Sequence, residues 1–373
     1  MLSSLRLDLR FAFRSLVRRP VFATIAVVTL ALGIGGATTI FSVVDGVLIR
    51  ELPYRDASSL VSVWRAWPSW RGQGLLDNVW DHIHFDLPNL QSIRDHATTL
   101  GQIEAHVARR ATLTGGGRAE EISVGLASVG LFPLLGVQPA IGRGFLPEEA
   151  FPAAVHGAKV ALLSHQLWAR RFGRDPGVVG RTIVLGGESY EVIGVLPAGF
   201  RLVSDLVRTH ENGGTIDGGD RDVWITLGRA STDCGNCLEV VARLAPGRTS
   251  VEARAEIQRL LIDQADPADQ LARVVAYKER LTQGFSTPLL LLFGASGVLL
   301  LIACLNVGGL LAGEATRRHQ EVAVRFALGA GRRRVAQQLI TENALLGLIG
   351  AGAAVLLAWL GTRALLSVAP PMP

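Results

Sequence analysis

The most constraining feature of this 373-residue chain is a set of three long apolar runs that contain no charged residue. The runs cover Val21–Val44, Pro288–Gly313 and Asn343–Thr362. An α-helix needs about 20 residues to cross a hydrocarbon core of roughly 30 Å, and each run is long enough to do so. One such run could be a buried helix of a soluble core, but three of them predict three membrane-spanning helices.

The first run could instead be the apolar part of a cleaved signal peptide. Such segments usually have about 7–15 apolar residues, and this run is longer. The sequence that follows it, Asp45–Arg50, offers no clear cleavage site of small residues. An uncleaved membrane anchor is therefore the favoured interpretation.

The charges beside the apolar runs predict an orientation in the membrane. Residues 1–20 carry five arginines and one aspartate, and residues 314–342 carry six arginines and three glutamates. Residues 45–287 carry 25 basic and 28 acidic side chains. The positive-inside rule then predicts a cytoplasmic N-terminus and an extracytoplasmic segment 45–287. The basic pI near 9.6 is explained by this topology, so we expect no nucleic-acid partner.

These features divide the chain into seven parts. Residues 1–20 predict an amphipathic helix on the inner membrane surface, with Leu5, Leu9 and Phe13 on its apolar face. The other parts are span 1 at 21–44, an extracytoplasmic domain at 45–287, span 2 at 288–312, a cytoplasmic coupling loop at 313–342, span 3 at 343–366 and a short extracytoplasmic tail at 367–373.

Small residues are frequent in the first span, among them Gly33, Gly35 and Gly36. Residues of this size let helices approach closely in lipid. Any one of these glycines could equally reflect the ordinary glycine content of membrane helices, so the sequence leaves their individual roles open.

The segment between the first two spans has short, mixed patterns that predict one compact α+β domain, with room for two lobes. Helices are expected at 84–96 and 251–265, and a mobile loop at 212–222. Strands are expected at 102–113, 121–128, 160–164, 182–185, 190–196, 238–244 and 272–277.

Motifs of known enzyme classes are missing from the sequence. It has no G-x-x-x-x-G-K-[ST] phosphate loop, and its lysines, Lys159 and Lys278, do not follow glycine-rich loops. The run Gly115–Arg118 is typical of a hairpin turn. There is also no nucleophile elbow and no H-E-x-x-H motif. We therefore expect neither enzymatic activity nor a cofactor.

Two polar or aromatic clusters allow a functional and a structural interpretation. The segment 81–84 with Asp86 has an H-x-H pattern that could hold a metal, although polar loops often have such residues without binding one. Three tryptophans at every third position could line a ligand surface, but packing is the favoured interpretation. These are Trp64, Trp67 and Trp70.

Two cysteines form a C-x-x-C pair at Cys234 and Cys237. In the cytosol this spacing would suggest redox or metal chemistry. Outside the membrane a local disulfide is the simpler interpretation. Cys304 lies within the second apolar run and is expected to be inert.

Several stretches carry motifs of a known family. They are DLRFAFRSL at 8–16, FSVVD at 41–45, GLFPLLGV at 130–137 with Gly142-Arg143, LSHQLW at 163–168 with RFG at 171–173, GRT at 180–182 with GVLP at 194–197, and RRHQEVAVRFALGA at 317–330. Together they cover nearly the whole chain. With them the chain resembles the MacB/FtsX-type permeases of ABC systems, and in particular the branch of duplicated orphan permeases.

The resemblance implies an extracytoplasmic domain of the MacB periplasmic-core type in a multi-pass protein of the bacterial inner membrane. It also implies a mechanotransmission or efflux function, in which a separate cytoplasmic ABC ATPase hydrolyses ATP and the periplasmic domain moves. Further implied partners are a second permease chain or a second copy, and a periplasmic adaptor. The residues expected to couple to the ATPase are Glu321, Val322, Val324, Arg325, Phe326, Leu328, Gly329 and Arg332.

The composition of this loop agrees with the implied coupling. Residues 322–328 would form a short helix that is apolar on nearly every side, and such a helix should be buried against lipid and a partner protein. A plain interfacial helix without a partner is the alternative. At the level of the whole chain, the alternatives are an FtsX-like signalling subunit that regulates an extracytoplasmic enzyme, and a membrane-tethered receptor domain without an ATPase.

One departure from the family pattern concerns the number of spans. The resemblance implies one span before the domain and three after it, whereas two apolar runs follow the domain here. The sequence-based expectation is a truncated product, or a missing helix that another permease chain supplies.

Overall fold

The computed structural model describes residues 2–78, 80–115, 117–150, 158–202, 208–209, 215–216, 221–228, 235–262, 269–283, 286–327 and 331–368. The chain separates into two compact units. The first combines residues 1–50 with 284–370 and is helical, and the second is built from residues 51–283.

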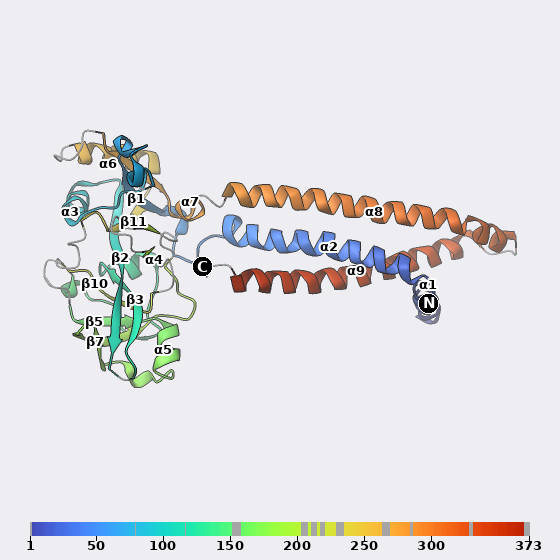
Figure 1. Cartoon of the computed structure of the whole chain (residues 1–373), viewed down its shortest axis with the longest axis horizontal. Coiled ribbons are helices and arrows are strands. Elements are labelled where there is room, and N and C mark those ends of the chain that lie inside the picture. Colours follow the sequence, from blue (N-terminus) through green and yellow to red (C-terminus); the bar gives the residue numbers. More distant parts are fainter. Residues whose placement is uncertain are drawn as a thin grey trace. The chain divides into compact units, whose positions relative to one another are not determined.

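The helical unit consists of one short and three long helices (Figure 1). These are α1 (Leu2–Val17), α2 (Pro20–Val44), α8 (Ser286–Ala327) and α9 (Arg332–Val368), and α2 continues into a π-helical turn, η1 (Asp45–Ile49). The segments Pro20–Ile49, Ser286–Arg317 and Val335–Ala364 are long and apolar enough to cross a membrane. This part of the predicted fold class is confirmed.

Helix α2 lies between α8 and α9 and packs against both, and α1 contacts α2 and α9 (Figure 1). Pro20 is the first residue of α2, where its missing N–H is not needed. On α1, Ala12 is fully buried, whereas Phe13 and Val17 are exposed. Large apolar side chains are also exposed along the outer faces of α8 and α9, as expected of helices whose surroundings are lipid.

The second unit is built on a ten-stranded mixed sheet. Its strands are β1 (Leu60–Ala66), β2 (Leu100–Thr114), β3 (Glu120–Ala127), β4 (Ile141–Gly142), β5 (Val160–Leu163), β6 (Thr182–Leu185), β7 (Glu188–Val195), β10 (Val223–Thr226), β11 (Glu239–Leu244) and β12 (Leu271–Ala276). A separate two-stranded sheet pairs β8 (Arg208–Thr209) with β9 (Thr215–Ile216).

The strand order is β12-β1-β11-β2-β3-β10-β5-β7-β4, and β6 pairs with both β2 and β7. Most neighbours are antiparallel, whereas β3–β10 and β5–β7 are parallel pairs. The first strand of the unit, β1, pairs along its length with the last, β12, in the register Val61↔Ala276 to Ala66↔Leu271. The points at which the chain enters and leaves this unit are therefore adjacent in its sheet.

Short helices complete the unit. They are α3 (Leu87–His96), α4 (Leu131–Leu135), α5 (His165–Arg171), α6 (Ser250–Ile262) and α7 (Tyr277–Thr282), with 3-10 turns at Ala57–Ser59, Pro68–Trp70, Gly74–Asn78, Pro147–Glu149 and Pro176–Val178. Two buried apolar clusters fill the two sides of the sheet, and all their members lie between residues 52 and 281. The predicted α+β domain is thus confirmed, and its core is self-contained.

Several details differ from the sequence-based expectation, and the short strand β10 is one element that was not expected. The helix expected from His84 begins at Leu87, because the side chain of Asp86 accepts a 2.9 Å hydrogen bond from the Asn89 backbone N–H and caps it. Strand β1 was missed, because almost every residue in it is buried and it lacks the alternation that marks a half-exposed strand. The expected mobile loop at 212–222 lies largely outside the described residues.

Candidate functional site

The predicted ATPase-coupling residues lie where α8 ends and α9 begins. Residues 321–326 belong to the last turns of α8, and Arg332 is the first residue of α9, whereas Leu328 and Gly329 lie outside the described residues. The described part of the short helix expected at 322–328, residues 322–327, is thus the end of one continuous helix of 42 residues. At about 1.5 Å per residue α8 is roughly 63 Å long, about twice the thickness of a hydrocarbon core.

The sequence explains why α8 does not break at the membrane surface. Residues 314–327 contain neither glycine nor proline, and glycines follow at 329 and 331. Alanine, arginine, glutamate and glutamine are favourable helix residues, so the helix persists until the glycines. A displacement of the segment at 321–327 would therefore be carried directly into the span.

Glycines of α2 form its contacts with both neighbouring helices. A Cβ atom on Gly33 would come within 2.6 Å of the Ala303 Cβ on α8. A Cβ on Gly35 would come within 2.9 Å of the Ala354 carbonyl oxygen on α9. Gly36, in contrast, has no described atom within 4 Å of such a Cβ. Two of the three glycines singled out in the sequence are therefore packing positions, and the third is not.

The Arg19 guanidinium pairs with the Glu314 carboxylate at one end of the α2–α8 pair. Arg19 directly precedes the first apolar run, and Glu314 directly follows the second. Sequence reasoning did not connect these residues, although opposite charges at matching ends of two antiparallel runs were a usable signal. Beside them, α2 and α8 border an open groove of about 1040 Å³.

In the sheet unit, two of the family-like motifs meet at one position. Gly142 of β4 pairs directly with Gly194 of β7. A Cβ on Gly142 would lie 2.2 Å from the Ile193 carbonyl oxygen, and Gly142 has a φ of +78° that favours glycine. The neighbouring Arg143 binds the Glu149 carboxylate at 2.8 Å. These motif residues therefore form a tight strand junction.

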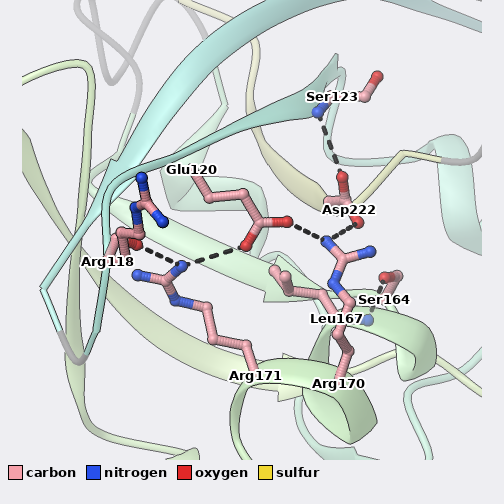
Figure 2. A network of polar contacts seen from close by, with 8 residues as sticks. All are labelled: Arg118, Glu120, Ser123, Ser164, Leu167, Arg170, Arg171 and Asp222. Carbon is pink, nitrogen blue, oxygen red and sulfur yellow. Dashed lines mark hydrogen bonds and ion pairs between the residues drawn. The ribbon is translucent and has the colours of Figure 1, made fainter.

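The motif at 163–173 carries a second set of contacts, shown in Figure 2. The Ser164 side chain accepts a hydrogen bond from the Leu167 N–H and caps α5. The Arg171 guanidinium binds the Glu120 carboxylate at 3.1 Å and donates to the Arg118 carbonyl at 3.0 Å (Figure 2). Arg171 thereby fixes α5 to the β2–β3 hairpin.

Arg170 extends this network to β10. Its guanidinium lies 2.8 Å from the Glu120 carboxylate and 3.2 Å from that of Asp222 (Figure 2). Burial raises the pKa of Asp222, although the Ser123 N–H and Arg170 oppose that shift. Sequence reasoning recognised the motif but missed the network, because its acidic members, Glu120 and Asp222, are far away along the chain.

The C-x-x-C turn lies beside a buried arginine. Cys237 is buried and disulfide-bonded, and Cys234 lies outside the described residues, so the pairing of Cys234 with Cys237 stays a prediction. Between the two cysteines, Asn236 accepts a 2.5 Å hydrogen bond from the guanidinium of Arg65. Arg65 is fully buried and also donates to the His84 carbonyl at 2.9 Å. The turn therefore supplies a hydrogen-bond acceptor, the Asn236 side-chain oxygen, to the buried guanidinium of Arg65.

The residues of the H-x-H segment make contacts other than metal coordination. Asp81 pairs with Arg273 at 3.2 Å, and the His82 ring stacks on Trp64. No group of three metal-ligating side chains occurs in the part of the chain that the structure describes. Trp64 and Trp67 are buried, and the half-buried Trp70 packs edge-on against Trp67 with ring centroids 4.4 Å apart, so these aromatic side chains pack within the domain.

Two family models match this chain, and together they include residues of both units. The model of the MacB-like periplasmic core domain matches residues 23–260, which is more than half of the chain. The model of the FtsX-like permease C-terminal domain matches residues 293–372.

Curated relatives are export proteins. The chain is 26% identical over 253 residues to the macrolide export ATP-binding/permease protein MacB of Hahella chejuensis, which covers 66% of this chain and 36% of that protein. It is 26% identical over 237 residues to the pyoverdine export ATP-binding/permease protein PvdT of Pseudomonas entomophila, covering 61% and 34%. The chain thus spans about a third of the length of these relatives.

Two solved structures are similar to this chain at low identity. The extracellular domain of the noncanonic ABC-type transporter YknZ from Gram-positive bacteria matches with a TM-score of 0.43 and 15% identity, covering 58% of this chain and 99% of that one. The periplasmic region of MacB from Actinobacillus actinomycetemcomitans matches with a TM-score of 0.43 and 11% identity, covering 65% and 96%. From the two family-model matches, the chain belongs to the MacB/FtsX-like family of ABC-type export permeases.

Proposed function

We propose that this chain is the membrane subunit of an ABC-type mechanotransmission or efflux system. A separate cytoplasmic ABC ATPase hydrolyses ATP and displaces the α8–α9 junction, and the helices pass this displacement to the periplasmic domain. A second permease chain or a second copy, and a periplasmic adaptor, complete the assembly. The exported compounds named for the relatives, macrolides and pyoverdine, suggest a medium-sized organic substrate.

The observation that carries this proposal is the continuity of α8. One unbroken helix joins residues 321–327 to the apolar segment Ser286–Arg317 and reaches back to the exit from the sheet unit. A helix is stiff along its axis because each turn is hydrogen-bonded to the next. Movement at one end therefore appears at the other end.

Close packing extends this movement to the other spans. The Gly33–Ala303 contact joins α2 to α8, and the Gly35–Ala354 contact joins α2 to α9. Helices whose backbones approach this closely have interlocking side chains, and their interface therefore resists sliding. The three helices would therefore move as one body, and two of them continue directly into the periplasmic domain through Arg50 and Gln283.

The same proposal includes an inner-membrane location with the N-terminus in the cytoplasm. The ion pair between Arg19 and Glu314 supports it, because it joins the ends of α2 and α8 that the arginine distribution assigns to the cytoplasm. A reporter that is active only outside the cytoplasm should work when fused after Gly186. A cytoplasmic reporter should work when fused after Ala330. Activity of the opposite reporter at either position would refute the orientation.

The coupling role is tested by replacing Phe326 with aspartate in the full chain. Membranes are solubilised, the chain is captured, and ATP-binding subunits are detected by photolabelling with azido-ATP and by ATPase activity. A charge placed in an apolar protein contact is costly, because it must give up its hydration. We expect the captured ATPase activity to fall at least tenfold.

Thr316→Ala is the matched control on the same helix. Thr316 is exposed, and its hydroxyl donates to the Ala312 carbonyl within α8. The captured activity should therefore equal that of the unchanged chain. If Phe326→Asp captures as much ATPase activity as Thr316→Ala, the segment at 321–327 is not where the ATPase binds.

A further inference from the structure

The groove between α2 and α8 combines an apolar interior with a basic end. Its α2 wall runs from Arg19 to Thr29, and its α8 wall runs from Leu305 to Arg317. Apolar side chains make up most of the interior. They are Pro20, Val21, Phe22, Ile25, Leu305 and Leu310, and the polar side chains of Thr29 and Asn306 lie among them.

Two glycines keep the groove open along its α8 wall. A Cβ on Gly309 or on Gly313 would have no described atom within 4 Å. Deeper in the helical unit the two helices converge, because a Cβ on Gly33 would meet the Ala303 Cβ at 2.6 Å. The groove is therefore a wedge that opens toward the basic end and closes toward the middle of the spans.

The length of the wedge matches one leaflet of a bilayer. At about 1.5 Å per residue, the α2 wall is roughly 15 Å long and the α8 wall roughly 18 Å. Half of a hydrocarbon core is roughly 15 Å. An acyl chain that enters from one leaflet can fill such a space, whereas a crossing helix needs twice this length and would collide with the Gly33–Ala303 contact.

The basic end is suited to an anionic headgroup. Arg19 pairs with Glu314, which leaves the exposed Arg317 as the net positive charge of the lining. Arg14 and Arg18 precede Arg19, and Arg318 follows Arg317, so the surrounding sequence is also basic. Basic pockets between membrane helices on the cytoplasmic side commonly bind anionic lipid headgroups.

We propose that this groove is a binding site for one anionic phospholipid, with its acyl chain along Gly309 and Gly313 and its phosphate at Arg317. The leaflet to which the lipid belongs follows from the orientation in the proposed function. The site itself depends only on the groove. A bound lipid would fill the wedge and stabilise the packing of α2 against α8 beside the Arg19–Glu314 pair.

The test is native mass spectrometry of the full chain, purified in mild detergent and stripped of lipid. The probes are phosphatidylglycerol and phosphatidylcholine with the same acyl chains. We expect phosphatidylglycerol to bind more tightly. Arg317→Gln should weaken phosphatidylglycerol binding about fivefold, since one basic side chain near an anionic membrane surface contributes about that factor. It should weaken phosphatidylcholine binding less, because the choline ammonium of that lipid already offsets the charge of its phosphate.

A second variant tests the acyl-chain part of the site. Gly309→Leu with Gly313→Leu fills the groove and should abolish binding of the tightly held lipid. Gly308→Leu is its matched control, because Gly308 has no described atom within 4 Å of a Cβ and does not line the groove. Arg363→Gln, on the far part of α9, is the charge control for Arg317. Circular dichroism shows whether each variant keeps its helices.

Three results would overturn the proposal. One is equal affinity for the two lipids, and another is unchanged binding in the groove-filling variant. The third is a lipid-free dimer in which a second copy seals the groove. None of these results depends on ATPase capture, so lipid binding and the proposed coupling function can fail separately.

Discussion

Replacing Gly125 with alanine should destabilise the periplasmic domain by about 3 kcal/mol, near the upper end of overpacking effects. Gly125 lies in β3, and a Cβ there would come within 2.3 Å of the Trp224 ring. That ring cannot move aside easily, because it is 2% exposed and packs edge-on against Phe132 at 5.4 Å. The measurement is urea unfolding of segment 51–283, whose core is self-contained.

Gly101→Ala is the control for this prediction. Gly101 also lies in a central strand, β2, but its added Cβ would meet Ala245 at an ordinary 3.7 Å. This variant should unfold within about 0.5 kcal/mol of the unchanged domain, as most surface changes do. Equal stability of the Gly125 and Gly101 variants would mean that the Trp224 ring shifts at little cost.

Replacing Gly35 with leucine should have a comparable effect on the helical unit. Its Cβ would lie 2.9 Å from the Ala354 carbonyl oxygen and 3.0 Å from the Leu357 side chain, so α9 must move away from α2. We expect a loss of about 1–3 kcal/mol, measured by unfolding the full chain in mixtures of mild detergent and dodecyl sulfate. ATPase capture and coupling should be reduced as well.

The adjacent Gly36→Leu is the matched control, because it has the same size and lies at the same depth. A Cβ at Gly36 has no described atom within 4 Å, so the leucine would face lipid. Its stability should equal that of the unchanged chain. If both variants lose stability equally, contact with α9 is not the cause of the loss.

The sequence was sufficient to predict the membrane helices, because apolar length and the absence of charge are properties of each segment alone. It was also sufficient for most strands that are half exposed, such as β2 and β3, because they alternate. It was insufficient for β1 and β10, in which nearly every residue is buried. The extent of α8 was also underestimated, because the arginines near residue 317 suggested an end that the helix-forming residues do not require.

The motif at 163–168 was recognisable in the sequence because it is local, and its Ser164 caps α5. The coupling role of the segment 317–330 stays a prediction. It was not predictable where contacts join distant segments. Arg171 with Glu120, and Arg19 with Glu314, depend on the fold to bring opposite charges together. The sequence also could not show that Gly35 packs against a neighbouring helix and Gly36 does not, because only the position of α9 distinguishes these two glycines.

The pairing of β1 with β12 determines how the periplasmic domain responds to force. Both chain connections leave from the same end of this antiparallel ladder, where Val61 lies opposite Ala276. Forces that pulled the two connections apart would break the hydrogen bonds between β1 and β12 one after another. A force that acted on both connections in the same direction would instead move the domain as a rigid body. Tyr54 and Tyr277, with ring centroids 6.1 Å apart, lie across this weak end. Two connections that move in step would therefore load this ladder least. The close approach of Gly33 to Ala303 holds α2 against α8, the two helices that lead to these connections.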